Sequence, residues 1–264
     1  MAYPLEAAQP VLASVDGWPI HLPDLKTALA RIIERARERS GFTVFTLNLD
    51  HLVKLRANRA FRDVYARADL VTADGAPIAW LSRFQQAGIE RTTGADMFIP
   101  LAMAAAKQRL PVYIFGSTMP VLTTAAQTLR KASGGTIEFA GLTSPSANFD
   151  PCGAEADAAI EIIKASGAAI CFVTLGAPKQ EIFSARAVEK GCGAGFICVG
   201  AAADFIAKTQ VRAPQVFQQY GLEWAWRLGN NPRRLGMRYA ACAAVLFDVV
   251  FVAPLRQRVV RRGI

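Results

Sequence analysis

Short runs of consecutive apolar residues alternate with longer stretches of helical spacing along most of this chain. Uninterrupted apolar runs of this length, bounded by turn residues, are typical of strands that are buried on both faces of a sheet. We therefore predict six strands. They lie at residues 43–47 (TVFTL), 69–73 (DLVTA), 111–115 (PVYIF), 136–140 (TIEFA), 168–175 (AAICFVTL) and 195–199 (GFICV).

The stretches between these runs have the spacing of amphipathic helices. The first helix precedes the strands: Leu25, Leu29, Ile32, Ile33 and Ala36 recur three or four residues apart, and a glycine at position 41 follows as a stop signal. Further helices are predicted at residues 50–66, 76–86, 95–108, 120–131, 154–166 and 179–190. This alternation predicts an α/β fold, with a Rossmann-like, doubly wound and largely parallel sheet.

After about residue 205 the pattern becomes helical only, so we expect a core at 1–205 followed by a helical appendage at 206–264. Within the appendage, residues 239–254 read YAACAAVLFDVVFVAP, an apolar run that only Asp248 interrupts. Arginines stand on both sides of this run. They are Arg227, Arg233, Arg234 and Arg238 before it, and Arg256, Arg258, Arg261 and Arg262 after it.

The charge of this segment indicates a membrane surface. Residues 227–264 carry a net +7 of the chain's +9. An anionic cytoplasmic leaflet attracts such a segment, and arginine suits phosphate groups. The run is shorter than the roughly 20 apolar residues of a membrane-spanning helix and contains a carboxylate, so we expect it to lie on the membrane. A helix packed in the core remains the alternative.

Composition limits the other functions. The chain is 52% apolar and 19% charged, as in globular proteins, and no secretion signal opens it, so we expect a cytoplasmic protein. Five cysteines without a CxxC pair favour reduced thiols, and two histidines, His21 and His51, leave little material for a metal site. We expect no metal and no cofactor. No GxGxxG or P-loop string is present, which disfavours a nicotinamide-dependent oxidoreductase or an ATP site.

The excess of basic residues, with a sequence pI near 9.6, also suggests nucleic-acid binding as a possible function. Single-strand binders combine their basic groups with aromatic side chains on which bases stack. Here the arginines flank an alanine-rich apolar helix instead. We therefore predict no nucleic-acid partner.

Candidate chemistry lies where strands end, because ligands of open α/β sheets bind outside the carboxyl ends of the strands. Thr46 and Asn48 end the first strand and share one side of it, although Asn48 is also a strong candidate for the cap of the next helix. Asp74, in the sequence TADGAP, is our candidate general base. The alternative for Asp74 is a plain Asp-Gly turn.

Later strand ends offer anion and nucleotide contacts. Arg91, Gly94 and Asp96 lie at the start of a predicted helix, where free N–H groups bind anions, although Asp96 also suits a helix cap. Gly116 and Gly176 follow two strands and allow close approach of the backbone to a ligand. The next helix carries Gln180, whose amide suits the edge of a base such as uracil, and Glu181, which alternatively serves only the helix dipole.

Read together, these motifs resemble the WecG/TagA/CpsF family of bacterial glycosyltransferases, from about residue 20 to 240. Each string is weak alone, but the set in this order is specific. The strings are T-x-N at 46–48, A-D-G at 73–75, R-x-x-G-x-D at 91–96, G-x-P-K-Q-E at 176–181, V-G-A-A at 199–202, R-A-P at 212–214 and G-L-E-W-x-x-R-L at 221–228.

The resemblance implies a metal-independent, inverting enzyme that transfers a sugar from a UDP donor to a glycan on a polyprenyl diphosphate at the inner membrane face. It implies that Asp74 is the catalytic base with Thr46 beside it, and that Gln180 and Glu181 contact the nucleotide. It further implies a C-terminal segment that docks on the membrane. The family's arginines for the lipid diphosphate fall among Arg212, Arg227 and Arg233.

The sequence is also compatible with another function and with self-association. A noncatalytic UDP-sugar-binding module associated with the membrane is the alternative function. Self-association into a homo-oligomer would bury the exposed appendage in the free enzyme.

Overall fold

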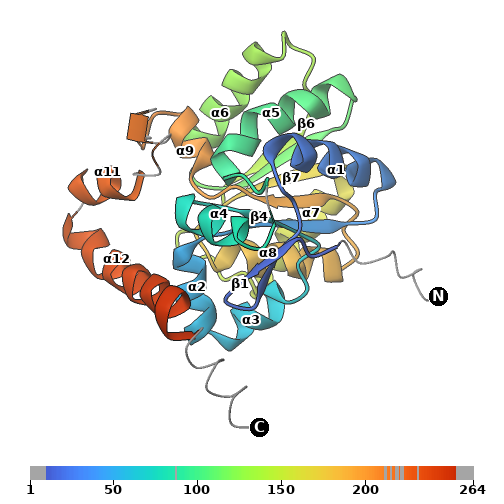
Figure 1. Ribbon diagram of the computed structural model, residues 1–264. Helices are drawn as coiled ribbons and strands as arrows, with labels where there is room; N and C mark the ends of the chain where they lie inside the picture. Colours follow the sequence, from blue (N-terminus) through green and yellow to red (C-terminus); the bar gives the residue numbers. More distant parts are fainter. Residues whose placement is uncertain are drawn as a thin grey trace.

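The computed structural model has a central sheet with helices on both faces and two C-terminal helices along one side (Figure 1). The structure describes residues 10–86, 88–210, 213–214, 216–217, 220, 223–230 and 232–253. The doubly wound α/β architecture that the sequence predicts is confirmed.

Six parallel strands form the sheet, in the order β4-β3-β8-β7-β5-β6. Five strands lie within two residues of the predicted bounds. β6 begins three residues late because Thr136 still belongs to the turn after the preceding helix, where its N–H donates to Ser133 O at 3.3 Å. The strands are β3 (Phe42–Leu47), β4 (Leu70–Ala73), β5 (Val112–Gly116), β6 (Phe139–Thr143), β7 (Ile170–Thr174) and β8 (Gly195–Cys198).

Two helical layers bury the apolar faces of the sheet. One layer holds α1 (Leu25–Glu38), α5 (Gly94–Lys107), α6 (Met119–Ala132) and α9 (Ala202–Ile206). The other holds α2 (Leu49–Ala57), α3 (Arg59–Tyr65), α7 (Ala154–Ala165) and α8 (Lys179–Glu189). β3 leads into α2 on one face and its neighbour β8 leads into α9 on the other. The chain therefore diverges between these two strand ends, and such divergence opens a ligand crevice.

The N-terminal part and the first crossover differ from the prediction. The helix expected at 50–66 is two helices, because Asn58 ends α2 and caps α3 by accepting a hydrogen bond from Phe61 N. A hairpin of β1 (Ala13–Val15) and β2 (Trp18–Ile20) was missed. Its strands of three residues are too short to give a periodic signal, although the Asp16-Gly17 turn is a known hairpin signal.

The C-terminal helices are α11 (Glu223–Asn230), α12 (Pro232–Phe247) and a π-helical turn, η1 (Asp248–Val252). Of these, α12 packs against α2, and α11 contacts α12. Cys242 and Val245 of α12 are buried, whereas Met237, Phe247 and Phe251 are 83%, 60% and 57% exposed. One side of the apolar run therefore packs on the core, and the other side is uncovered.

Ion pairs fasten this helix to α2 at two points. Arg238 Nε lies 2.6 Å from Asp50 Oδ1, and Arg56 of α2 lies 2.8 Å from Asp248 Oδ2. Arg56 also pairs with Asp16 in the hairpin turn, at 2.8 Å. Asp248 thus faces the core. Among the described residues, 235–252 is the one helical stretch whose length and composition would allow a membrane crossing, and 11% of it is buried.

We predict that Arg56→Gln loosens the end of the appendage. The change removes the charge that holds both Asp248 and Asp16, and partly exposed pairs of this kind are each worth up to about 1 kcal/mol. Hydrogen exchange measured by mass spectrometry should become several-fold faster in residues 245–252. The control is Arg59→Gln, at an exposed position on α3. Equal exchange in both variants would show that the ion pairs do not hold the helix.

Candidate active site

A cleft of about 730 Å³ opens at the carboxyl ends of the strands, below the C-terminal helices. Its volume is in the range of small-molecule sites. The ends of β3, β4, β7 and β8 form one side, with the first turns of α4 (Ala76–Arg83) and α5. Residues Glu223 and Trp224 of α11 and Arg238, Tyr239, Cys242, Ala243 and Leu246 of α12 form the other.

Asp74 and Asn48 meet in this cleft. Asn48 Nδ2 donates to Asp74 Oδ2 at 3.3 Å, and Asn48 Oδ1 accepts from His51 N at 2.9 Å. The two interpretations of Asn48 are therefore compatible, because one end of the amide caps α2 while the other contacts the carboxylate. Thr46, 4% exposed, lines the cleft from the same strand.

The pKa of Asp74 is raised to about 6, chiefly because burial removes water from the carboxylate. The hydrogen bond from Asn48 and the charge of Arg91 act in the opposite direction and keep the pKa from rising further. A carboxylate with a pKa near 6 is ionised at neutral pH and is a better proton acceptor than an ordinary aspartate. Asp74 is thus suited to remove a proton from a ligand in the cleft.

Arg91 lies between the core and the appendage. Its guanidinium is 3.3 Å from Asp96 Oδ2 and 3.4 Å from Glu223 Oε2 of α11. Asp96 forms a capping box with Thr93 at the start of α5 and does not line the cleft. The capping interpretation of Asp96 therefore holds. The cleft does reach Arg91 and Gly94.

Gly94 allows α5 to begin against the end of β8. A Cβ at this position would lie 2.6 Å from Val199 Cα, closer than real Cβ atoms come. The first N–H groups of a helix have no acceptor within it, and they favour anions together with the helix dipole. Because Gly94 and Ala95 line the cleft, the dipole of α5 favours negative charge at this wall.

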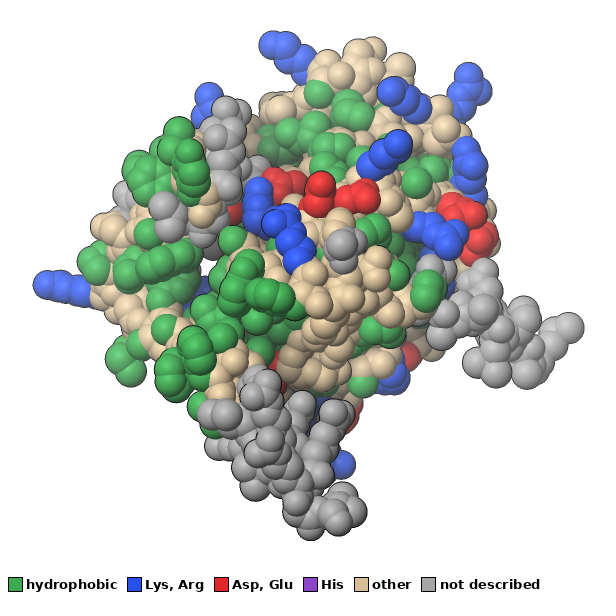
Figure 2. Space-filling view, viewed as in Figure 1, with side chains coloured by type: hydrophobic (Ala, Val, Ile, Leu, Met, Phe, Trp, Pro, Cys, Tyr) green, Lys and Arg blue, Asp and Glu red, His purple; other side chains and the backbone are tan. Residues whose placement is uncertain are grey.

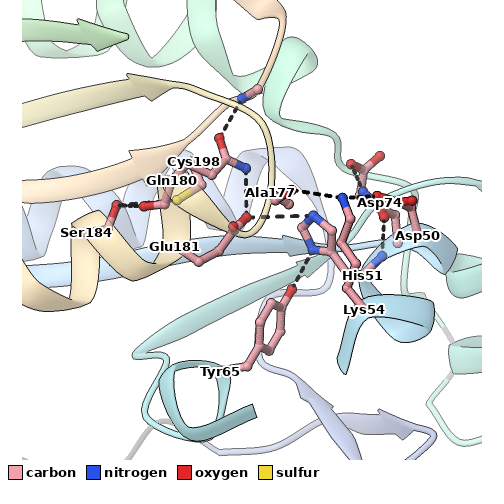
Figure 3. A network of polar contacts seen from close by, with 12 residues as sticks. Asp50, His51, Lys54, Tyr65, Asp74, Ala177, Gln180, Glu181, Ser184 and Cys198 are labelled. Atoms are coloured by element: carbon pink, nitrogen blue, oxygen red, sulfur yellow. Dashed lines mark hydrogen bonds and ion pairs between the residues drawn. The ribbon is translucent and has the colours of Figure 1, made fainter. Parts of the chain in front are cut away.

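Glu181, expected at the nucleotide, is instead fully buried behind the cleft. Gln180 Nε2 donates to Glu181 Oε1 at 2.7 Å, and Gln180 Oε1 accepts from Gly200 N at 3.1 Å. Figure 3 shows this network continuing through His51, whose Nε2 lies 3.7 Å from Glu181 Oε1, to the Tyr65 hydroxyl. Gln180 reaches the cleft, but its amide already positions the turn after β8.

Burial governs the protonation of this network. It raises the pKa of Glu181 to about 7 and lowers the pKa of His51 to about 3, so the imidazole is neutral at physiological pH. Glu181 Oε2 has no hydrogen-bond partner. A buried carboxylate with an unsatisfied oxygen is costly when ionised, which explains why its proton is held so firmly.

The two predicted glycines differ in position. Gly176 lines the cleft, whereas Gly116 does not. Gly116 has a φ of +123°, and a Cβ there would lie 2.6 Å from Thr174 O. A side chain would therefore clash with β7, so the structure gives Gly116 a packing role.

Of the three arginines predicted for the lipid diphosphate, only Arg233 has a described side chain. Arg212 and the side chain of Arg227 lie outside the described residues, and Arg233 is exposed on α12 without lining the cleft. Arg238 lines it instead, with Lys54 of α2. Lys54 Nζ lies 2.5 Å from Asp50 Oδ2 and donates to Ala177 O at 2.9 Å.

Neither of these cations was predicted to lie in the site. Arg238 was one of eight arginines near the apolar run, and nothing local to it indicates that it faces Asp50. Lys54 lies one helical turn after Asp50, and this spacing is a common ion-pair signal in helices. No group of three or more His, Cys, Asp or Glu residues in the described part of the chain is arranged to hold a metal ion.

We predict that Glu181→Gln alters the pH dependence of stability. Because the folded pKa lies above the ordinary 4.5, the folded state keeps a proton that the unfolded state loses, so wild-type stability falls as pH rises from about 4.5 to about 7. The raised pKa of Asp74 also makes stability fall as pH rises, but mainly up to about pH 6. His51 acts in the opposite direction, because its pKa is about 3 in the folded state while its unfolded imidazole titrates near 6.5. The variant shares the contributions of Asp74 and His51. Chemical denaturation should therefore show that the wild type loses up to about 1.4 kcal/mol of stability relative to Glu181→Gln between pH 6 and 7.

Glu161→Gln, at an exposed position on α7, is the matched control and should keep the wild-type slope. A Glu181→Gln protein with the same pH dependence of stability as the wild type between pH 6 and 7 would contradict a raised pKa at this carboxyl.

Comparison with known protein families assigns the chain to one of them. The model of the family described as "Glycosyl transferase WecG/TagA/CpsF family" matches residues 13–261 of the 264-residue chain. The match covers the sheet, both helical layers and the C-terminal helices that cover the cleft. The chain therefore belongs to the WecG/TagA/CpsF family of glycosyltransferases.

Proposed function

We propose that this glycosyltransferase is inverting and metal-independent. It moves a hexose or N-acetylhexosamine-type sugar from a UDP donor to a glycan on a polyprenyl diphosphate, in the biosynthesis of a surface polysaccharide. The observation that carries the proposal is the Asp74 carboxyl, which lies in the cleft with a pKa of about 6 and is held by Asn48.

In this mechanism Asp74 acts as the general base. The hydroxyl oxygen of the acceptor sugar attacks the anomeric carbon of the donor while Asp74 takes the hydroxyl proton. The bond from that carbon to the UDP oxygen breaks, and UDP leaves with the electron pair. A single displacement from the opposite face inverts the anomeric configuration. Thr46 and Asn48, on the same strand end, position the reacting groups.

Negative charge develops on the departing UDP and must be stabilised. The first turn of α5 and the Arg91 guanidinium supply N–H donors at one wall of the cleft. Gly176 and the turn that Gln180 and Glu181 hold give the nucleotide a close backbone surface. Lys54 and Arg238, which both pair with Asp50 and line the cleft, are placed to contact the acceptor diphosphate, and Arg212, Arg227 and Arg233 remain candidates for the same group.

Membrane attachment places the enzyme beside its lipid-linked acceptor. The uncovered apolar side of α12 and η1, with the arginines on both sides of it, fits a peripheral position at the inner face of the cell membrane. In this arrangement residues 206–264 act as a docking unit on the 1–205 core. The ion pairs of Arg238 and Arg56 keep the helix along the core while its other side meets lipid.

We predict that Asp74→Asn retains donor binding and loses turnover. Asparagine keeps the shape but cannot accept the proton, and a positioned base contributes about 10²- to 10⁴-fold to the rate. Mass spectrometry of the product with a panel of UDP-sugars and a lipid-linked acceptor measures turnover, and calorimetry measures UDP-sugar affinity. Asp63→Asn, exposed on α3, is the control. Full turnover by Asp74→Asn would exclude it as the base and favour the noncatalytic binding module.

We also predict a specific pH profile. Because Asp74 must be ionised to act, kcat/KM should rise with pH and level off above an apparent pKa near 6. Asn48→Ser keeps a capping side chain but removes the amide donor that lowers the pKa of Asp74. The inflection should therefore move to higher pH in this variant. An inflection that stays in place, or a wild-type rate that is flat between pH 5 and 8, would contradict the assignment.

A further inference from the structure

We propose that an apolar groove between α4 and η1 binds the prenyl chain of the acceptor, next to its diphosphate. This inference rests on the proposed function, because it assigns a site for one part of that substrate. The groove encloses about 360 Å³. Its lining residues are Ser14, Val15 and Asp16 of the β1 hairpin, Trp80, Leu81, Phe84 and Gln85 of α4 and the residues after it, and Val249 and Val250 of η1.

The groove adjoins the candidate catalytic cleft. Pro77 of α4 and Leu246 of α12 line the cleft, and Leu81 and Val249, about one helical turn further along the same elements, line the groove. Both helical segments therefore extend away from Asp74 and form the two walls. A molecule with its head in the cleft can continue into the groove between them.

The outer wall exposes two large aromatic side chains. Trp80 is 49% exposed and Phe84 is 72% exposed, and their rings form an edge-to-face pair with centroids 4.9 Å apart. Figure 2 shows apolar side chains on both sides of the opening between the C-terminal helices and the core. Contiguous exposed apolar surface of this kind marks a binding site for lipid, protein or ligand.

The distribution of polar groups favours an amphiphilic lipid among these occupants. The cleft end carries cations together with carboxylates, which are Lys54, Arg91 and Arg238, and Asp50, Asp74, Asp204 and Glu223. The described residues that line the groove include no lysine or arginine and one carboxylate, Asp16. The site thus changes from charged to largely apolar along its length. A second copy of this chain would cover the aromatic pair but would not require a charged cleft beside it. An isoprenoid chain attached to a polar head group requires both.

The test compares two acceptors that share one glycan diphosphate and differ in the lipid, which is either a long prenyl chain or a short water-soluble chain. The assay is run in detergent, so that attachment to a bilayer does not contribute. For the double variant Trp80→Gln/Phe84→Gln we expect kcat/KM to fall about tenfold or more with the long-chain acceptor, because its apolar contacts are lost, and to stay unchanged with the short-chain acceptor. Ile162→Gln, at a 54% exposed position on α7, should change neither value.

Several results would overturn the groove. Equal losses of kcat/KM with both acceptors would do so, as would a wild type that does not prefer the long-chain acceptor. A double variant that loses only vesicle binding would identify a bilayer contact as the occupant. A double variant whose only change is dissociation of a dimer in sedimentation would identify a second copy of the chain.

A separate binding measurement distinguishes failure of the groove from failure of the proposed function. A photoreactive prenyl diphosphate should label peptides of residues 76–85 and 246–252 in the wild type, and labelling elsewhere would contradict the groove. If wild-type protein transfers sugar to neither acceptor but is labelled at these peptides, the proposed transfer reaction is wrong, whereas the proposed binding of a prenyl chain in the groove is supported.

Discussion

The parallel register of β3 and β4 is the constraint on which the site depends. Leu47 lies opposite Ala73, and Asp74 N continues the ladder by donating to Leu47 O at 2.8 Å. The residues just beyond these strand ends, Asn48 and Asp74, are therefore brought together from positions far apart in sequence. A slip of one residue would turn Asp74 to the other face of the sheet and separate it from the Asn48 amide.

The C-terminal helices form the second side of the cleft, opposite the strand ends of the sheet. The charge of Glu223 on α11 adds to the burial that raises the pKa of Asp74 and makes its carboxylate a stronger base. The same helices bring Glu223 to Arg91 and Arg238 to Asp50, so charged groups of both the core and the appendage determine the electrostatic potential in the cleft. Asp248, which interrupts the apolar run, pairs with Arg56 on α2 and so fastens one side of this helix to the core, while the other side stays uncovered.

Much of this could be predicted because buried parallel strands appear as uninterrupted apolar runs, and their polar ends mark the ligand edge. Asn48, Asp74, Arg91 and Gly94 were found in this way. Contacts between distant segments could not be predicted: the rotation of α12, which makes Arg238 rather than Arg233 reach the cleft, is set by Asp50 and Arg56 on α2. The depth of Glu181 also depends on how α8 packs against α2 and α3 through His51 and Tyr65.

The central claim is that the fold makes Asp74 a base by partly excluding it from water. The most direct test is a titration of the Asp74 side-chain carboxyl carbon, followed by NMR in protein labelled at aspartate and assigned with Asp74→Asn. The account predicts a pKa of about 6. A value near the ordinary 3.8 would contradict it, because the carboxylate would then be as solvated as a surface aspartate.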